Sequence, residues 1–139
     1  MDTRPASYVV AQRDGAVLLA HWNEGGRTGW TLPGGGMEGR ESTEETAIRE
    51  FREETGYEVA LDGLLGVDTY YVDGVDRLVP GAGDLRCVRV IYTGHVVGGD
   101  LTHEVDGTTD ECRWVPLAEV AELDTVSLVD VALEMLAGP

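Results

Sequence analysis

The sequence GGMEGRESTEETAIREFREETGY spans residues 35–57 and decides what the chain folds into. Residues 41–56 within it predict a helix, because Ala47, Ile48 and Phe51 recur at spacings of three and four. Such a stripe would lie on one side of a helix and face a hydrophobic core. The stretch therefore predicts an amphipathic helix that follows a glycine-rich segment.

A second face of this helix carries an unusual charge pattern. Glu50, Glu53 and Glu54 share one face at 3.6 residues per turn. Like charges at these spacings each destabilise a helix by about 0.2–0.5 kcal/mol, unless a positive group offsets them. A hard divalent cation such as Mg²⁺ prefers such oxygen ligands. The alternative is a solvated acidic face that pairs with Arg49 and Arg52.

The segment directly upstream favours the metal site over the solvated face. Residues 30–36 read WTLPGGG, which is apolar and rigid before it becomes glycine-rich. Glycines allow a backbone to approach a ligand closely. A merely solvated acidic helix does not predict such a segment at its start.

The charged and glycine positions keep fixed spacings. Five residues separate Gly35 from Glu41, seven separate Glu41 from Arg49-Glu50, and Glu53-Glu54 and Gly56 follow. This pattern resembles the Nudix box of MutT-like hydrolases position for position. Two positions depart mildly, because bulky Phe51 and Tyr57 stand where the family usually has aliphatic residues. The resemblance implies an α/β (α+β) fold, a sandwich with a mixed β-sheet between helices.

The resemblance also implies roles for individual residues. Glu50 and Glu54 would bind the catalytic metal, with Glu53 as a direct or water-mediated third ligand and a carbonyl of Gly34 or Gly35 beside them. Arg49 would orient a glutamate through a bidentate contact. Glu41 would hold the loop to the helix. The implied cofactor is Mg²⁺, with Mn²⁺ as the alternative.

The implied activity is the hydrolysis of a phosphoanhydride bond in a nucleoside diphosphate linked to another group. A nucleoside triphosphate, a nucleotide sugar and a dinucleotide all remain open as substrates. Two alternatives belong to other classes: a hydrolase of a non-nucleotide diphosphate such as an isoprenoid diphosphate, and a non-catalytic sensor. No box glutamate is missing, which disfavours the sensor.

The general base is not assigned by the motif. An acid outside the box is one option, and Glu104, Asp110 and Glu111 are candidates in an acidic stretch before Trp114. Each of the three is equally open to being a solvated loop carboxylate. His103, in the same stretch, is expected to lie on the surface.

Four residues are candidates for binding the substrate elsewhere. Arg27 precedes the WTLP segment and is suited to hold a phosphate. Trp30, Tyr70 and Tyr71 are suited to stack on a base. Since neighbouring residues of a strand point to opposite faces, only one of the two tyrosines is expected to face a pocket, and at least one is expected in the core.

The remaining elements follow from alternation and turn signals. Strands are expected at residues 7–13 and 16–22 around an Asp14-Gly15 turn. Residues 23–29 and 73–84 are expected to be loops, 57–72 to hold one or two strands, and 87–97 and 113–116 to be strands. Residues 117–123 and 126–136 are expected to be helices. Ser42 with Glu45 predicts a capping box for the helix at residues 41–56, and Gly56 its end.

Composition limits the class of protein. The 139 residues suit one domain, expected at 1–139. Twenty-six acids against ten bases give a charge of −16, which disfavours nucleic acid as a partner. The resemblance to the Nudix box is what implies a small nucleotide as the partner. Cys87 and Cys112 form no metal motif and are expected to be buried thiols in a reducing cytoplasm. No membrane span or signal peptide is expected, and a homodimer is left open.

Overall fold

The computed structural model describes residues 1–102 and 107–138. Its strands and helices, in chain order, are β1 (Asp2–Arg13), β2 (Ala16–Glu24), β3 (Arg27–Thr31), β4 (Gly34–Gly36), α1 (Thr43–Thr55), β5 (Tyr57–Val72), the 3₁₀ turn η1 (Gly74–Asp76), β6 (Leu85–Gly99), β7 (Thr109–Pro116), the 3₁₀ helix η2 (Leu117–Glu122) and α2 (Ser127–Ala137). Among these residues, no helix is long and apolar enough to span a bilayer.

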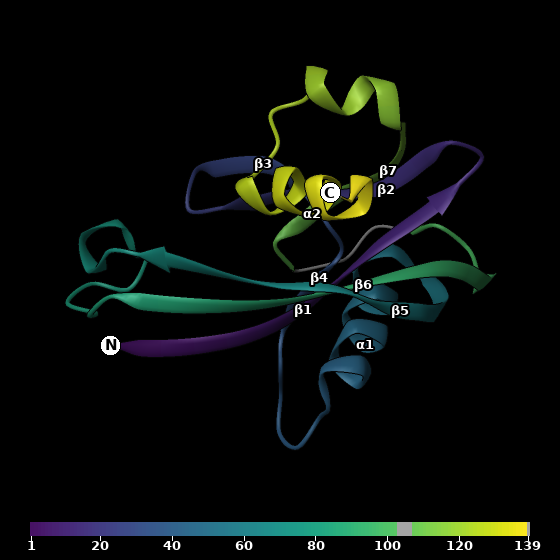
Figure 1. Cartoon of the computed structure of the whole chain (residues 1–139). Helices are drawn as coiled ribbons and strands as arrows, with labels where there is room; N and C mark the ends of the chain where they lie inside the picture. The colour runs from purple at the N-terminus through teal and green to yellow at the C-terminus, as the bar shows by residue number, and fades with distance from the viewer. Residues whose placement is uncertain (103–106, 139) are drawn as a thin grey trace.

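The sheet is mixed, as expected. Its strands run in the order β3-β2-β1-β6-β5, with β4 added to β1 and β7 added to β2. β1 and β6 pair in parallel, whereas the other pairs are antiparallel. Helices α1 and α2 lie on opposite sides of the strands (Figure 1). The expected sandwich is therefore confirmed.

Two apolar clusters hold the helices to the sheet. Phe51 and Ala47 of α1 are fully buried and pack with Leu18 and Val9 of the sheet. Val129 of α2 is fully buried in the second cluster. Burying a large side chain of this kind contributes about 1.5–3 kcal/mol before entropy is counted. The stripe expected for the central helix thus fixes the face that α1 packs against the sheet.

The ends of α1 follow the predicted signals. Ser42 Oγ accepts a hydrogen bond from the Glu45 amide at 3.1 Å, and Glu45 Oε1 accepts one from the Ser42 amide at 3.0 Å. Gly56 ends the helix with φ of 83°, a left-handed conformation that glycine adopts without strain. Both predictions are confirmed.

Several element boundaries differ from the expectations. Residues 23–29 are not a loop, because β2 and β3 continue through them and only Gly25 and Gly26 turn the chain. The Gly34–Gly36 segment pairs with β1. Residues 57–72 form one strand whose pairing with β6 shifts at three bulges. Cys112 is buried as expected, whereas Cys87 is only partly buried, and both thiols are free.

β1 begins five residues before the expected start. Its parallel pairing with β6 already begins at Asp2 opposite Leu85 and runs through Pro5. Arg4 is therefore a sheet residue. On the alternating pattern of a strand it shares a face with Tyr8.

Candidate active site

Arg49 organises the acidic side of α1. Its Nε and Nη2 donate to the two carboxylate oxygens of Glu41 at 2.6 and 3.0 Å. Its Nη1 also donates to Glu50 at 3.1 Å and to Glu53 at 3.2 Å. The predicted bidentate contact is present, and Glu41 is the carboxylate that receives it. One guanidinium thus offsets part of the repulsion among these glutamates.

Glu41 ties the loop before α1 to the helix. Its Oε1 accepts hydrogen bonds from the Glu38 amide at 2.9 Å and from Thr46 Oγ1 at 3.0 Å. The hydrogen bond from Arg49, followed by that from Glu38, lowers the pKa of Glu41 to about 2. Glu41 is therefore ionised at neutral pH and suited to the supporting position that we expected.

Glu54 is the most buried carboxylate of the group, with 9% of the residue exposed. Its Oε2 accepts a hydrogen bond from the Gly34 amide at 2.8 Å. Its Oε1 accepts one from Thr109 Oγ1 at 3.3 Å. A buried carboxylate needs such donors, because burying a charge without them is costly. Glu54 therefore joins α1 to both β4 and β7.

Glu50 lies against the backbone of Gly35. A Cβ atom placed on Gly35 would lie 2.6 Å from the Glu50 carboxylate carbon, closer than real Cβ contacts come. The absence of a side chain at Gly35 is thus what allows the carboxylate to occupy this position. Glu50 and Glu54 consequently converge on the Gly34–Gly36 strand.

Glu53 differs from the other two box glutamates. Its side chain is 51% exposed and contacts Arg49. We expected three carboxylates on one face, and the structure places two of them at β4 and one on the outer side. Arg49 Nη1 donates to both Glu50 and Glu53, which keeps these two carboxylates near each other.

The donor set fits a hard cation that keeps part of its water shell. Among the described residues, no group of three or more acids, histidines or cysteines forms a ready-made metal cage. Mg²⁺ is usually held by only one or two protein carboxylates, with waters and substrate phosphates completing its shell. Glu50, Glu54 and the backbone beside them provide oxygen donors of this kind.

A cavity opens directly over Glu54. Its volume is about 490 Å³, within the range of small-molecule sites. We call it the inner cavity, and its lining includes Arg4, Tyr8, Trp22, Gly34, Glu54 and Thr109. Glu54 of α1 and the cationic side chain of Arg4 therefore meet in one concave site.

Two of the inner cavity's residues were not foreseen from the sequence. Arg4 lies outside the strand that was expected to begin at residue 7. Trp22 keeps regular pairing with β3 opposite Gly29, and the pairing of β2 with β7 shifts beside it because β7 carries one extra residue, Asp110. Bulges re-aim side chains near active sites, and local sequence carried no signal for this one. The alternation of Arg4 with Tyr8 would have been a signal had the longer strand been recognised.

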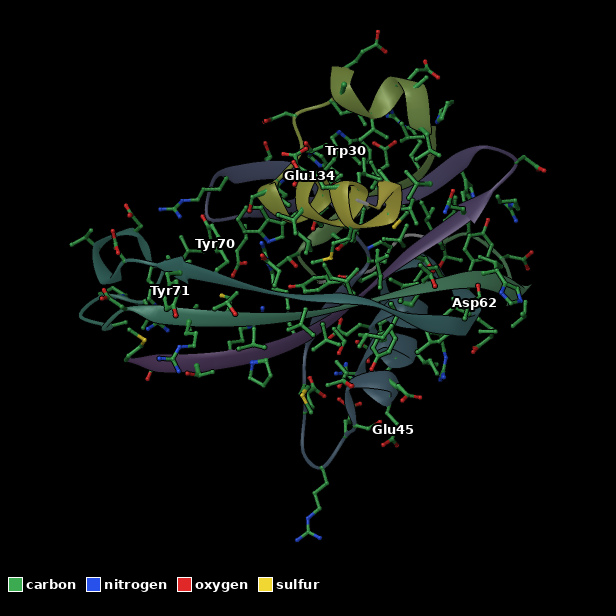
Figure 2. All side chains as sticks on the ribbon, viewed as in Figure 1. Trp30, Glu45, Asp62, Tyr70, Tyr71 and Glu134 are labelled. Atoms are coloured by element: carbon green, nitrogen blue, oxygen red, sulfur yellow. The ribbon has the colours of Figure 1, made fainter. Side chains whose placement is uncertain are left out.

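The stacking role expected for Trp30 is contradicted. Trp30 is 8% exposed and belongs to the core cluster beside α2 (Figure 2). The Arg113 guanidinium lies 4.8 Å from its ring centroid, and the His21 ring lies 5.0 Å away. Its ring is thus occupied by protein neighbours, because β3 turns this residue towards α2.

The expectation that Tyr70 or Tyr71 is a core residue is wrong. Tyr70 is 45% exposed and Tyr71 is 55% exposed, and both lie on the part of β5 that extends away from the helices (Figure 2). Both line a second cavity of about 770 Å³, together with Arg27, so the expectation that only one of them faces a pocket is also wrong. We call this the outer cavity. β5 continues beyond the layer that α1 and α2 cover, so neither of its faces is buried there.

The acids proposed outside the box lie in different places. The carboxylate of Asp110 accepts a hydrogen bond from His21 Nδ1 at 2.7 Å and one from Asn23 Nδ2 at 3.4 Å. The contact with His21 is the main reason that the pKa of Asp110 is lowered. Glu111 pairs with Arg113 at 2.9 Å. Glu104 and His103 lie outside the described residues.

Comparisons with known proteins agree with this fold. Residues 1–132 match the model of the NUDIX domain family. A Mycobacterium tuberculosis protein named as a candidate mutator protein, MutT4, is 34% identical over 126 residues, covering 87% of this chain and 48% of that protein. The RNA pyrophosphohydrolase of Sphingopyxis alaskensis is 29% identical over 126 residues, covering 85% and 80%.

A solved NUDIX hydrolase from Nitrosomonas europaea superposes with a TM-score of 0.81 at 21% identity, covering 98% of this chain and 89% of that one. The chain therefore belongs to the Nudix hydrolase family. It spans about half the length of the mycobacterial relative.

Proposed function

We propose that the chain hydrolyses a phosphoanhydride bond in a nucleoside diphosphate linked to another group. The observation that carries this proposal is the position of Glu54. Its carboxylate is buried at the floor of the inner cavity, bonded to the Gly34 amide and beside Glu50. Family membership and the names of the relatives support the same class of reaction.

Glu50 and Glu54 would hold a divalent cation, for which Mg²⁺ is our first choice and Mn²⁺ the second. When bound, the ion would neutralise phosphate charge and lower the pKa of a coordinated water. Other side chains of this protein position the ligands. Arg49 positions Glu50 and Glu53, and Glu41 positions Arg49.

Arg4 is suited to receive the substrate's phosphates. It lines the inner cavity with Glu54, and an arginine remains charged throughout the physiological range. A planar guanidinium matches phosphate oxygens and can donate two hydrogen bonds to them. In a protein of charge −16, a cation at this position offsets the repulsion that an anionic substrate would meet.

The lining of the inner cavity favours a nucleotide over an isoprenoid diphosphate. Aromatic Tyr8 and Trp22 stand beside charged Arg4, Glu24 and Glu54. Such a mixture suits a flat ring with polar edges better than a hydrocarbon chain. Because the net charge of −16 repels a polyanion, a small nucleotide is a better partner than a long nucleic acid.

The test is hydrolysis of a panel of substrates, each with Mg²⁺ and with EDTA, with the nucleoside monophosphate and the second phosphorylated product separated by chromatography. The panel contains nucleoside triphosphates, oxidised purine triphosphates, ADP-ribose, nucleotide sugars, dinucleoside polyphosphates, isoprenoid diphosphates and a short RNA with a 5′-triphosphate. We expect EDTA-sensitive hydrolysis of a small nucleotide. Hydrolysis that persists in EDTA, or activity only on the isoprenoid diphosphates, would contradict the proposal.

The Glu54→Gln variant tests the assignment of the site. We expect turnover to fall at least about 10²-fold while the fold is kept, because the change removes a charged oxygen ligand. Glu58→Gln is the matched control, since Glu58 is a half-exposed glutamate of β5 that pairs with Arg52. Unchanged turnover of Glu54→Gln at saturating Mg²⁺ would reject Glu54 as a ligand.

A further inference from the structure

The inner and outer cavities adjoin each other. Trp22 and Val126 line both of them, so the two volumes lie on either side of a common wall. Each volume, about 490 and 770 Å³, falls within the range of about 300–1,000 Å³ that holds a drug-sized group. The space beside the acidic site is therefore large enough for a substrate with a bulky group at each end.

The outer cavity is bounded by two segments that are distant in sequence. Arg27 of β3 donates from Nη1 to the carbonyl oxygen of Asp76 in η1 at 2.9 Å. A Cβ atom on Gly25 would lie 3.0 Å from Leu78, so the β2–β3 turn also contacts the loop after η1. These contacts join the β2–β3 hairpin to the far end of β5 and β6.

Tyr70 provides a held aromatic ring in this cavity. The Arg89 guanidinium lies 4.9 Å from the ring centroid. Arg89 is itself buried, is hydrogen-bonded to Asp68 and donates to Ser127 Oγ at 3.4 Å. The ring therefore rests on a fixed support on one side, while the residue remains 45% exposed. A ring held in this way binds a flat partner with little loss of side-chain entropy.

The charges of the outer cavity are mixed. Asp73 and Asp76 line it together with Arg27, and Asp68 offsets the charge of Arg89. This balance favours a neutral ring with donors and acceptors at its edge, such as a nucleobase, over a second phosphate group. The inner cavity, with Arg4 and Glu54, differs in offering a phosphate site.

We propose that the outer cavity binds a heteroaromatic ring at the second end of the substrate, stacked on Tyr70. The substrate class would then be a dinucleoside polyphosphate or related dinucleotide, with one ring in each cavity and the phosphates at Glu54. This inference rests on the proposed hydrolase function for its biological meaning, but the binding preference that it predicts can be measured without hydrolysis.

The test compares diadenosine tetraphosphate with ATP by isothermal titration calorimetry, with EDTA present so that hydrolysis plays no part. We expect the wild-type protein to bind the two-ring ligand at least about tenfold more tightly, since one stacked base contributes a factor of this order or more. Tyr70→Ala should remove this preference, whereas Tyr70→Phe, which keeps the ring, should retain it. Arg27→Ala should weaken the preference, with the exposed Arg40→Ala as the matched control.

Three results would overturn the inference: equal affinity of the wild type for both ligands, equal losses for both in Tyr70→Ala, or no binding of diadenosine tetraphosphate at millimolar concentration. The substrate panel is read separately. If no substrate of the panel is hydrolysed, the proposed hydrolase function is rejected. A Tyr70-dependent preference for diadenosine tetraphosphate over ATP in calorimetry would still support the two-ring site.

Discussion

At the scale of single residues, the backbone of Gly35 lies against the carboxylate of Glu50, which we propose as a metal ligand. We expect Gly35→Ala to lower turnover by at least about tenfold, since misplacing a catalytic group by about 1 Å can cost 10²-fold. The added Cβ would lie 2.6 Å from the Glu50 carboxylate carbon, and the flexible glutamate must move away. The measurement is kcat/KM on the substrate found in the panel.

The matched control for this prediction is Gly63→Ala. A Cβ on Gly63 meets no atom within 4 Å, so that variant should keep its activity. Gly35→Ala should also keep most of its thermal stability, because only the end of a side chain has to shift. A variant that unfolds, or one with unchanged kcat/KM, would contradict the proposed contact between Gly35 and Glu50.

The lowered pKa of Glu41 predicts that the stability of the fold depends on pH. Its pKa of about 2 in the folded protein lies below the ordinary value of 4.5, mainly through Arg49. A depressed pKa stabilises the fold above pH 4.5, and this stability is lost as the pH falls towards about 2. Glu41→Gln should therefore lower Tm at pH 7, and the difference from wild type should shrink between pH 4.5 and 2.

The measurement is a series of thermal melts of both proteins across that pH range. A difference in Tm that stays constant down to pH 2 would show that the charge of Glu41 contributes nothing through Arg49.

At the scale of elements, the start of α1 depends on its cap. Ser42→Ala removes the hydroxyl that accepts from the Glu45 amide, and we expect the free energy of unfolding to fall by about 1 kcal/mol. Urea titration measures this change. Ser42→Thr keeps an acceptor at the same position and should recover most of the loss. Equal stability of Ser42→Ala and wild type would mean that Glu45 or water satisfies the helix end alone.

The elements that local signals govern were predictable. The helix at residues 41–56 carried its stripe, its cap and its terminal glycine in the sequence, and the structure confirms all three. The hairpin across residues 23–29 was missed, because its polar and glycine-rich residues resemble a loop although Asn23 and Glu24 pair with Thr28 and Arg27. The early start of β1 depends on β6 in the same way.

At the scale of the whole molecule, the net negative charge predicts that a divalent cation stabilises the folded protein. The chain carries −16, and part of this charge is concentrated on α1. We expect millimolar Mg²⁺ to raise Tm, because a ligand that binds only the folded state stabilises it by about 2.7 kcal/mol at 100 times its Kd. NaCl at matched ionic strength is the control. An equal rise with NaCl would indicate general screening of the acids and would contradict a specific site.

The sequence by itself determined the family, the central helix and the acids on its outer side, because these are properties of spacing along one chain segment. Only the tertiary structure decided that Glu50 and Glu54 converge on β4 while Glu53 does not, and that Arg4 and Trp22 join them in a cavity. It also placed Trp30 in the core and left Tyr70 exposed beside Arg27. The physical reason is that strand pairing and bulges set these positions through contacts between distant segments, and no local pattern encodes them.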